Sequence, residues 1–252
     1  MFRTLRQWLL LAIMTSTLVL GGCLPQSGSQ SSAANPSPTE TASASVNQAS
    51  NPQPGNLPRL DGKATIAIVV KGGTITADID GTDAPITAGN FVDLAQRGVY
   101  DGLSFHRVVR QPEPFVVQGG DPLSKDPKVP PEQLGTGSFI DPVTNQPRYI
   151  PLEIEPVGAT TPIYHQTFET AGVTVKPKLT HKRGALAMAR SQLPDSASSQ
   201  FYITLSNVNF LDGSYAVFGY VTEGMDIVDK IQQGDRIQSV KVVKGLENLK
   251  KA

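Results

Sequence analysis

Runs of β-branched residues dominate the chain after residue 58. Thr65–Val70 is one such run and Thr74–Ile79 an alternating one, and the Lys71-Gly72-Gly73 link between them predicts a hairpin. Many short runs of this kind are typical of a closed antiparallel β-barrel. Further strands are predicted at Phe105–Val109, Phe115–Gln118, Ala185–Ala189, Gln200–Leu205, Ala216–Val221 and Ile237–Val243.

Two stretches have helical spacing instead. The first begins at Pro85 and ends at Gly98, with Phe91 and Leu94 on one face, and proline and glycine are typical of those two ends. The second lies near Gly224–Gln233. We therefore expect a mainly β fold, a closed antiparallel barrel with a helix at each end.

Residues 121–180 break the strand pattern because they hold ten of the twenty Pro residues. Proline within a central strand removes a ladder hydrogen bond. We predict a long Pro-rich insertion at the surface with one strand, Tyr149–Ile154. Large apolar residues such as Phe139 and Phe168 indicate that the insertion packs on the barrel, although the barrel is expected to fold without most of it.

The amino-terminal segment has the pattern of an export signal. Arg3 and Arg6 precede 16 uncharged residues, Gln7–Gly22, which is short of the roughly 20 residues that a membrane-spanning helix needs. Leu20-Gly21-Gly22-Cys23 resembles the lipobox of bacterial lipoproteins, in which the cysteine carries the lipid. We predict a signal peptide at 1–22 and lipidation at Cys23. The alternative is an ordinary cleaved signal with an incidental cysteine.

Residues 24–58 contain eight Ser, six Pro and a single charged residue, Glu40. Large apolar residues are nearly absent, so the segment cannot offset the entropy of ordering. We expect residues 23–58 to form the lipidated end and a disordered tether, with residues 59–252 as one folded domain. This arrangement predicts an exported protein anchored to a membrane and facing the periplasm or the thylakoid lumen.

The charge balance and the cysteine count exclude several functions. The chain has 22 basic and 22 acidic residues, so nothing in its net charge attracts nucleic acid. A single Cys rules out a disulfide framework and a cysteine-based zinc site, and three His leave little material for metal catalysis. We therefore expect no metal, no cofactor and no nucleic-acid partner. We also expect a monomeric protein.

Several short motifs follow one another in the folded part. Together they resemble the cyclophilin family of peptidyl-prolyl cis-trans isomerases, whose fold is an eight-stranded barrel capped by two helices. The resemblance runs from about Ala64 to Gly245 and implies an enzyme that isomerises X-Pro bonds of exported proteins. The motifs are Tyr100-Asp101-Gly102, Phe105-His106-Arg107-Val108, Gln118-Gly119-Gly120-Asp121, Ser199-Gln200-Phe201-Tyr202-Ile203, Phe210-Leu211-Asp212-Gly213 and Val217-Phe218-Gly219.

The resemblance also implies the catalytic and binding residues. Arg107 falls at the position of the guanidinium that donates to the substrate, and Gln118 matches the side chain that holds the substrate carbonyl. Tyr215 stands where the family usually has a His at the edge of the proline pocket. The residues expected to bind the substrate are Phe115, Val116, Ala189, Arg190, Gln200, Tyr202, Phe210, Leu211 and Tyr215.

The chemistry of such a reaction suits this composition. Rotation about an X-Pro amide has a barrier of roughly 18–20 kcal/mol and breaks no covalent bond, so no nucleophile or metal is needed. As the amide twists, its nitrogen gains a lone pair, and a rigid guanidinium can donate to it. Two other functions stay open: a membrane-tethered module that binds or chaperones proline peptides with little turnover, and a plain β-barrel scaffold or small-ligand carrier.

Overall fold

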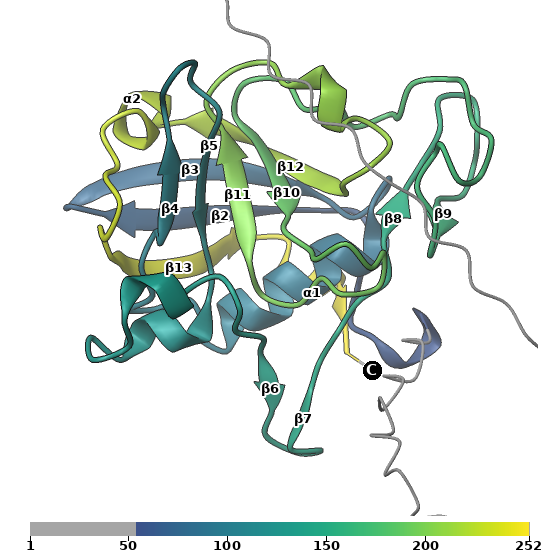
Figure 1. Cartoon of the computed structure of the whole chain (residues 1–252). Helices are drawn as coiled ribbons and strands as arrows, with labels where there is room; N and C mark the ends of the chain where they lie inside the picture. Colours follow the sequence, from purple (N-terminus) through teal and green to yellow (C-terminus); the bar gives the residue numbers. More distant parts are fainter. Residues whose placement is uncertain (1–53, 252) are drawn as a thin grey trace, which may run out of the picture. The chain divides into compact units, whose positions relative to one another are not determined.

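The structure, a computed structural model, describes residues 54–251. The predicted signal peptide, Cys23 and the tether up to residue 53 lie outside the described residues. Eight strands form one antiparallel sheet that curls round on itself (Figure 1), in the order β13-β2-β3-β12-β10-β11-β5-β4. The strands of this sheet are β2 (Lys63–Val70), β3 (Gly73–Asp80), β4 (Arg107–Val109), β5 (Val116–Gly119), β10 (Ala185–Met188), β11 (Phe201–Thr204), β12 (Val217–Glu223) and β13 (Ile237–Lys244).

The two edge strands of the sheet, β4 and β13, approach each other at one end. The chain just before β4 lies beside the start of β13, where Ile237 N donates to Leu103 O and Phe105 N donates to Asp235 O, both at 2.8 Å. Ser104 and Arg236 form an isolated bridge there. Within residues 54–251, β4 and β13 themselves are not paired. The mainly β, eight-stranded fold is confirmed, whereas closure of the barrel stays a prediction.

Alternation along the strands creates the core. In β2 every second residue, from Ala64 to Val70, points inward and is buried, as a period of two requires of a sheet with one covered face. Phe91 of α1 (Pro85–Gln96) packs against this interior, with ring centroids 4.9 Å from Tyr100 and 5.2 Å from Phe201. The core therefore lies between α1 and the concave side of the sheet.

The helices differ in length from the prediction. Helix α1 forms nearly as expected, but α2 (Met225–Val228) has only one turn, so the prediction of a helix over Gly224–Gln233 is wrong in extent. The reason is local, because Lys230 N and Ile231 N donate to the carbonyl groups three residues before them, which tightens the chain into a 3₁₀-type turn. No helix among the described residues has both the length and the apolar character needed to cross a membrane.

The Pro-rich insertion consists of short pieces. The predicted strand Tyr149–Ile154 forms only at β8 (Glu153–Ile154), which pairs with β9 (Ile163–Tyr164). Pro151 has no N–H to donate, so a continuous ladder is impossible there. A separate hairpin projects from the lower side of Figure 1. The remaining elements are β1 (Arg59–Leu60), β6 (Ile140–Asp141), β7 (Gln146–Pro147), β14 (Leu249–Lys250), and the 3₁₀ turns η1 (Pro54–Asn56), η2 (Pro122–Lys125), η3 (Pro131–Gln133), η4 (Asn209–Leu211) and η5 (Leu246–Asn248).

The insertion is bonded to the first turn of α1. The cap position of this helix, Ala84, offers no side-chain acceptor. Glu153 of β8 accepts from Ile86 N at 3.1 Å and from Thr87 N at 2.7 Å, and the Tyr164 hydroxyl donates to the same carboxylate at 2.9 Å. A carboxylate from the insertion thus satisfies two of the N–H groups that every helix leaves unpaired at its start.

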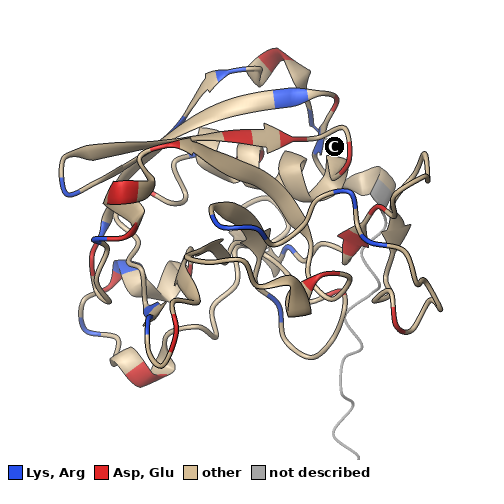
Figure 2. Ribbon diagram, turned by 90° about the horizontal axis from the view of Figure 1, so that it is seen from above, with Lys and Arg blue, Asp and Glu red and all other residues tan. Residues whose placement is uncertain are grey.

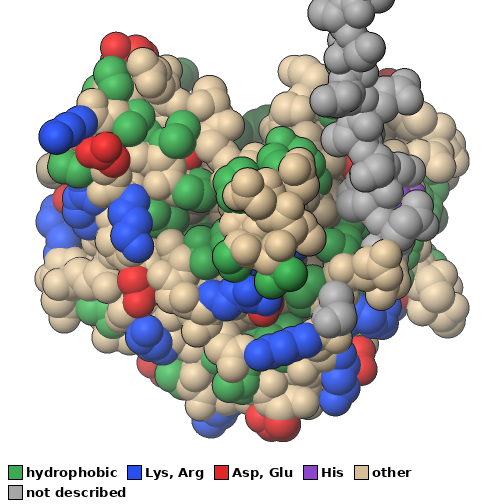
Figure 3. Space-filling view, turned by 90° about the horizontal axis from the view of Figure 1, so that it is seen from below, with side chains coloured by type: hydrophobic (Ala, Val, Ile, Leu, Met, Phe, Trp, Pro, Cys, Tyr) green, Lys and Arg blue, Asp and Glu red, His purple; other side chains and the backbone are tan. Residues whose placement is uncertain are grey.

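Basic and acidic residues are both spread over the strands and loops (Figure 2). On the face drawn in Figure 3, hydrophobic side chains gather near the middle of the view, and basic and acidic side chains lie scattered between them. The surface in these views therefore has the mixed character that its balanced composition suggests.

Candidate functional site

The convex face of the sheet, opposite the core, carries the candidate residues. The register pairs Arg107 of β4 with Gln118 of β5, and Gln118 with Tyr202 of β11. Directly paired residues in an antiparallel sheet point to the same side. Val117 and Ile203, each next to one of these residues, belong to the buried core. Alternation therefore brings Arg107, Gln118 and Tyr202 together on the outer face.

These side chains border one cavity of about 240 Å³. A small apolar cluster on the outer face, which includes Val116 and Tyr202, forms its floor. All of its lining residues belong to the set that the sequence predicts for the site. They are Arg107, Phe115, Val116, Gln118, Ala189, Arg190, Tyr202, Leu211 and Tyr215. We call this space the candidate proline pocket.

Arg107 lies at the polar side of the candidate proline pocket. The residue is exposed, its Nη1 lies 3.4 Å from Gln118 Oε1, and its guanidinium lies 5.7 Å from the centroid of the Phe115 ring. Gln118 Nε2 donates in turn to Gln200 Oε1 at 3.2 Å. The guanidinium is therefore held beside the pocket and still has N–H groups that face away from Gln118.

Aromatic rings shape the other side of the pocket. Tyr202 is 5% exposed, and its ring meets that of Tyr215 edge to face, with centroids 6.2 Å apart. Burial raises the pKa of the Tyr202 hydroxyl well above its ordinary value, so this group stays protonated near neutral pH. The floor of the pocket is thus apolar and uncharged.

Two predicted residues lie outside the lining of the candidate proline pocket. Phe210 is 73% exposed and stacks on Phe115 at 5.8 Å between centroids, so it stands at the rim. Gln200 lines a neighbouring groove of about 480 Å³, which Gln118 and Arg190 share. The groove continues the site away from the pocket.

Ala189 and Arg190 have contacts that sequence reasoning did not foresee. Ala189 N already donates to Gln200 O at 2.9 Å. The Arg190 guanidinium donates to Ser214 O from Nε and Nη2, at 3.1 and 2.7 Å, and lies 4.6 Å from the Tyr215 ring centroid. The Arg190 side chain therefore fixes the wall of the site.

Sequence reasoning also missed one wall of the neighbouring groove. Gly135–Ser138 and Tyr149 of the insertion line it, and Gln200 Nε2 donates to Gly137 O at 2.8 Å. No hydrophobic periodicity in the sequence marks these positions, because the bond from the Gln200 side chain to the backbone carbonyl of Gly137 joins residues far apart in the chain. Within residues 54–251, no group of three or more His, Cys, Asp and Glu side chains gathers in a way that could hold a metal ion.

Comparison with known proteins gives the family. The model of the family "Cyclophilin type peptidyl-prolyl cis-trans isomerase/CLD" matches residues 65–249. This chain belongs to the cyclophilin-type peptidyl-prolyl cis-trans isomerase family. The family that the sequence motifs indicated is therefore confirmed.

Two curated relatives and one solved structure are similar to the chain. A Synechocystis protein, named "Putative thylakoid lumen peptidyl-prolyl cis-trans isomerase", is 43% identical over 77% of this chain and 50% of its own length. A chloroplastic isomerase of Arabidopsis thaliana is 41% identical over 77% of this chain and 45% of its own. The chain thus spans about half the length of these curated relatives.

The solved structure supports the fold alone. It is a Cryptosporidium parvum cyclophilin-type isomerase crystallised in the presence of the dipeptide Ala-Pro, with a TM-score of 0.53 and 23% identity. The alignment covers 71% of this chain and 99% of that one.

Proposed function

We propose that the protein is a peptidyl-prolyl cis-trans isomerase that acts on X-Pro bonds of exported polypeptides. The observation that carries this proposal is the position of the Arg107 guanidinium at the edge of a cavity of about 240 Å³ whose floor is apolar. Membership of the family supports it.

The proposed mechanism is non-covalent. The proline ring sits among Val116, Leu211 and Tyr202, and the acyl side of the amide rotates beside Gln118. As the nitrogen becomes pyramidal, Arg107 donates a hydrogen bond to its lone pair, which exists only in the twisted state, and this differential contact lowers the barrier.

One charge-assisted bond is worth about 1.5–3 kcal/mol, whereas an ordinary turnover requires the barrier to fall by on the order of 7 kcal/mol. The remainder must come from holding the ring away from water in the oriented geometry. The apolar, uncharged floor of the candidate proline pocket suits this role.

The test is Arg107→Ala in a proline-isomer assay with a protease-coupled readout. Loss of one oriented donor should lower kcat/KM by about 10²–10³ with little change in thermal stability, because Arg107 is exposed. The matched control is Arg110→Ala. That guanidinium donates to Ile231 O at 2.7 Å and does not line the pocket.

The control should keep most of the activity. A folded Arg107→Ala protein with the full rate would contradict the proposed mechanism. Peptide binding without any rate in the unchanged protein would favour the module that binds proline peptides with little turnover.

We also propose where the protein works. Export through the segment 1–22, lipidation at Cys23 and a tether would hold a monomeric domain on the order of 30 Å from a membrane surface. The tether is shorter than the predicted residues 23–58, because residues 54–56 form η1 and Leu57 is part of the core. The lumenal and chloroplastic names of the relatives support a site outside the cytoplasm. We further propose that the backbone bonds between residues 102–105 and 234–237 close the sheet into the predicted barrel.

A further inference from the structure

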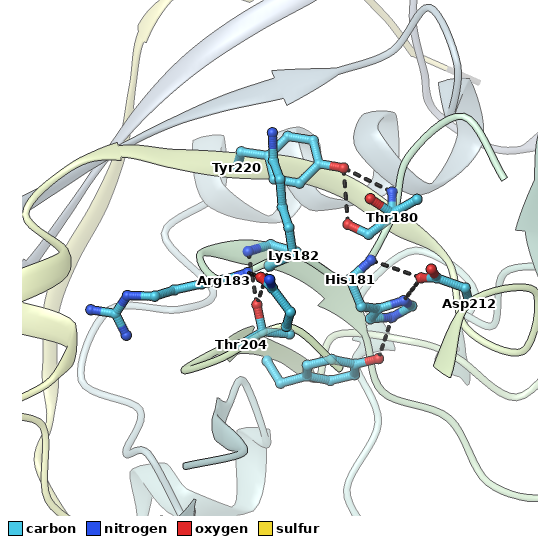
Figure 4. A network of polar contacts seen from close by, with 10 residues as sticks. Thr180, His181, Lys182, Arg183, Thr204, Asp212 and Tyr220 are labelled. Atoms are coloured by element: carbon cyan, nitrogen blue, oxygen red, sulfur yellow. Dashed lines mark hydrogen bonds and ion pairs between the residues drawn. The ribbon is translucent and has the colours of Figure 1, made fainter. Parts of the chain in front are cut away.

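A buried histidine contacts Tyr202, which lines the candidate proline pocket, and Figure 4 shows this histidine, His181, bonded to Asp212. The His181 side chain is 1% exposed. Its Nε2 lies 3.0 Å from the Tyr202 hydroxyl, and its Nδ1 lies 2.8 Å from Asp212 Oδ1. None of the sequence motifs assigns a task to His181, yet it joins a residue that lines the pocket to a carboxylate.

The bonding pattern fixes the tautomer. Asp212 Oδ1 also accepts from His181 N at 2.8 Å, so the carboxylate acts as acceptor throughout, and Nδ1 must carry a hydrogen. Burial lowers the pKa of the His181 imidazole, and the bond to Asp212 only partly opposes this, so the ring is neutral near pH 7. Its Nε2 is then an acceptor, and the Tyr202 hydroxyl donates to it.

His181 also holds the turn that forms the pocket wall. Val208 N donates to His181 O at 2.8 Å, and Asp212 directly follows Leu211, which lines the pocket. Tyr202 belongs to β11 and Leu211 to η4. One imidazole and its own backbone therefore connect the floor of the pocket to its wall.

We propose that His181 is a positioning residue for proline binding: with its hydrogen on Nδ1, it holds the Tyr202 ring in register with Leu211. This role rests on the proposed isomerase function. Burial and the number of bonds make His181 structural as well, and the test must separate the two roles.

The test uses three variants and one control. His181→Phe removes the acceptor while keeping a ring, and it leaves the Tyr202 hydroxyl unpaired. KM for a proline tetrapeptide should rise about three- to tenfold, equivalent to one neutral hydrogen bond, while kcat changes less than about twofold because Arg107 is untouched. Tyr202→Phe added to His181→Phe removes the unpaired hydroxyl and should bring KM back toward the value of Tyr202→Phe alone.

Tyr220→Phe is the matched control. The Tyr220 hydroxyl bonds to Thr180 N at 2.9 Å and to Thr180 O at 3.0 Å, next to His181 but away from the pocket lining. This variant should lower thermal stability without changing KM. If His181→Phe lowers stability as Tyr220→Phe does but leaves KM unchanged, His181 is purely structural and the proposal is wrong.

Two further measurements do not depend on turnover, and the first of them needs no variant. Nitrogen NMR of the imidazole in the unchanged protein should show the hydrogen on Nδ1 at neutral pH, and a hydrogen on Nε2 would overturn the proposal. Titration of the tetrapeptide by NMR gives Kd for every variant. Binding without turnover in the unchanged protein would refute the proposed function, and the Kd values would still decide the role of His181.

Discussion

The carboxylate of Glu153 offers a sharp test of how the Pro-rich insertion contributes to the domain. Glu153→Ala leaves Ile86 N and Thr87 N without their acceptor at the start of α1. It also removes the acceptor of the Tyr164 hydroxyl. Glu153 is only 1% exposed, so bulk solvent barely reaches the carboxylate.

The magnitude follows from the two orphaned donors. Each buried backbone donor left unpaired costs about 1–3 kcal/mol, so loss of the acceptor for Ile86 N and Thr87 N should lower the free energy of unfolding of Glu153→Ala by about 2–6 kcal/mol. For a domain of this size the melting temperature should fall by about 4–24 °C. Glu153→Gln keeps one acceptor oxygen and should fall between Glu153→Ala and the unchanged protein.

The assay is thermal unfolding of each variant as a function of pH. Burial raises the pKa of Glu153, and the hydrogen bonds only partly oppose the shift. Between the ordinary and the raised pKa the folded state then binds more protons than the unfolded state, so this group's stabilisation is complete at acidic pH and is lost as pH rises. Glu153→Gln lacks this loss, and its deficit should shrink as pH rises.

The matched control is Glu132→Gln, an exposed glutamate of η3, which should leave the melting temperature unchanged within about 1 °C. A fall of less than about 2 °C for Glu153→Ala, or a deficit of Glu153→Gln that grows with pH, would refute the reasoning.

Two further predictions concern the lipid anchor and the Pro-rich insertion. Cys23→Ser should release the protein from membranes into the aqueous phase of a detergent partition; equal membrane binding of both forms would rule out the lipid anchor. Replacement of residues 156–178 by a short Gly-Ser link should leave a folded domain that still isomerises tetrapeptides. Its melting temperature should be lower because the Tyr164 bond to Glu153 is lost. Its rate on a protein substrate should change more than its rate on tetrapeptides. Failure of that protein to fold would show that the segment is part of the core.

The longer strands could be predicted from sequence because their alternation is local. The run Thr65–Val70 lies within β2, and Ile237–Val243 within β13, since burial of every second residue needs no knowledge of distant partners. The strand predicted over Phe105–Val109 begins only at Arg107. Phe105 is bonded to the backbone of residues 234 and 235 instead, a contact that no window of sequence contains.

The candidate site, too, could be predicted from sequence only in part. Residues of the pocket follow from motifs on neighbouring strands, and the register of those strands brings them together. Phe210 could not be placed from its motif alone, because its exposure depends on stacking with Phe115. The cap on α1 was also beyond reach, since capping is recognised in sequence only when the acceptor is close to the helix start, and Glu153 belongs to the insertion.

The pairing of β2 with β13 also determines the order in which the domain can assemble. β2 is among the first strands to be synthesised and β13 among the last, so one edge of β2 has no partner until residue 237 and its successors are made. Contacts between such distant segments form slowly, and an open strand edge is a template for other chains. A growing chain that stalls before residue 237 would therefore expose that backbone edge, and aggregation would compete with folding at this point.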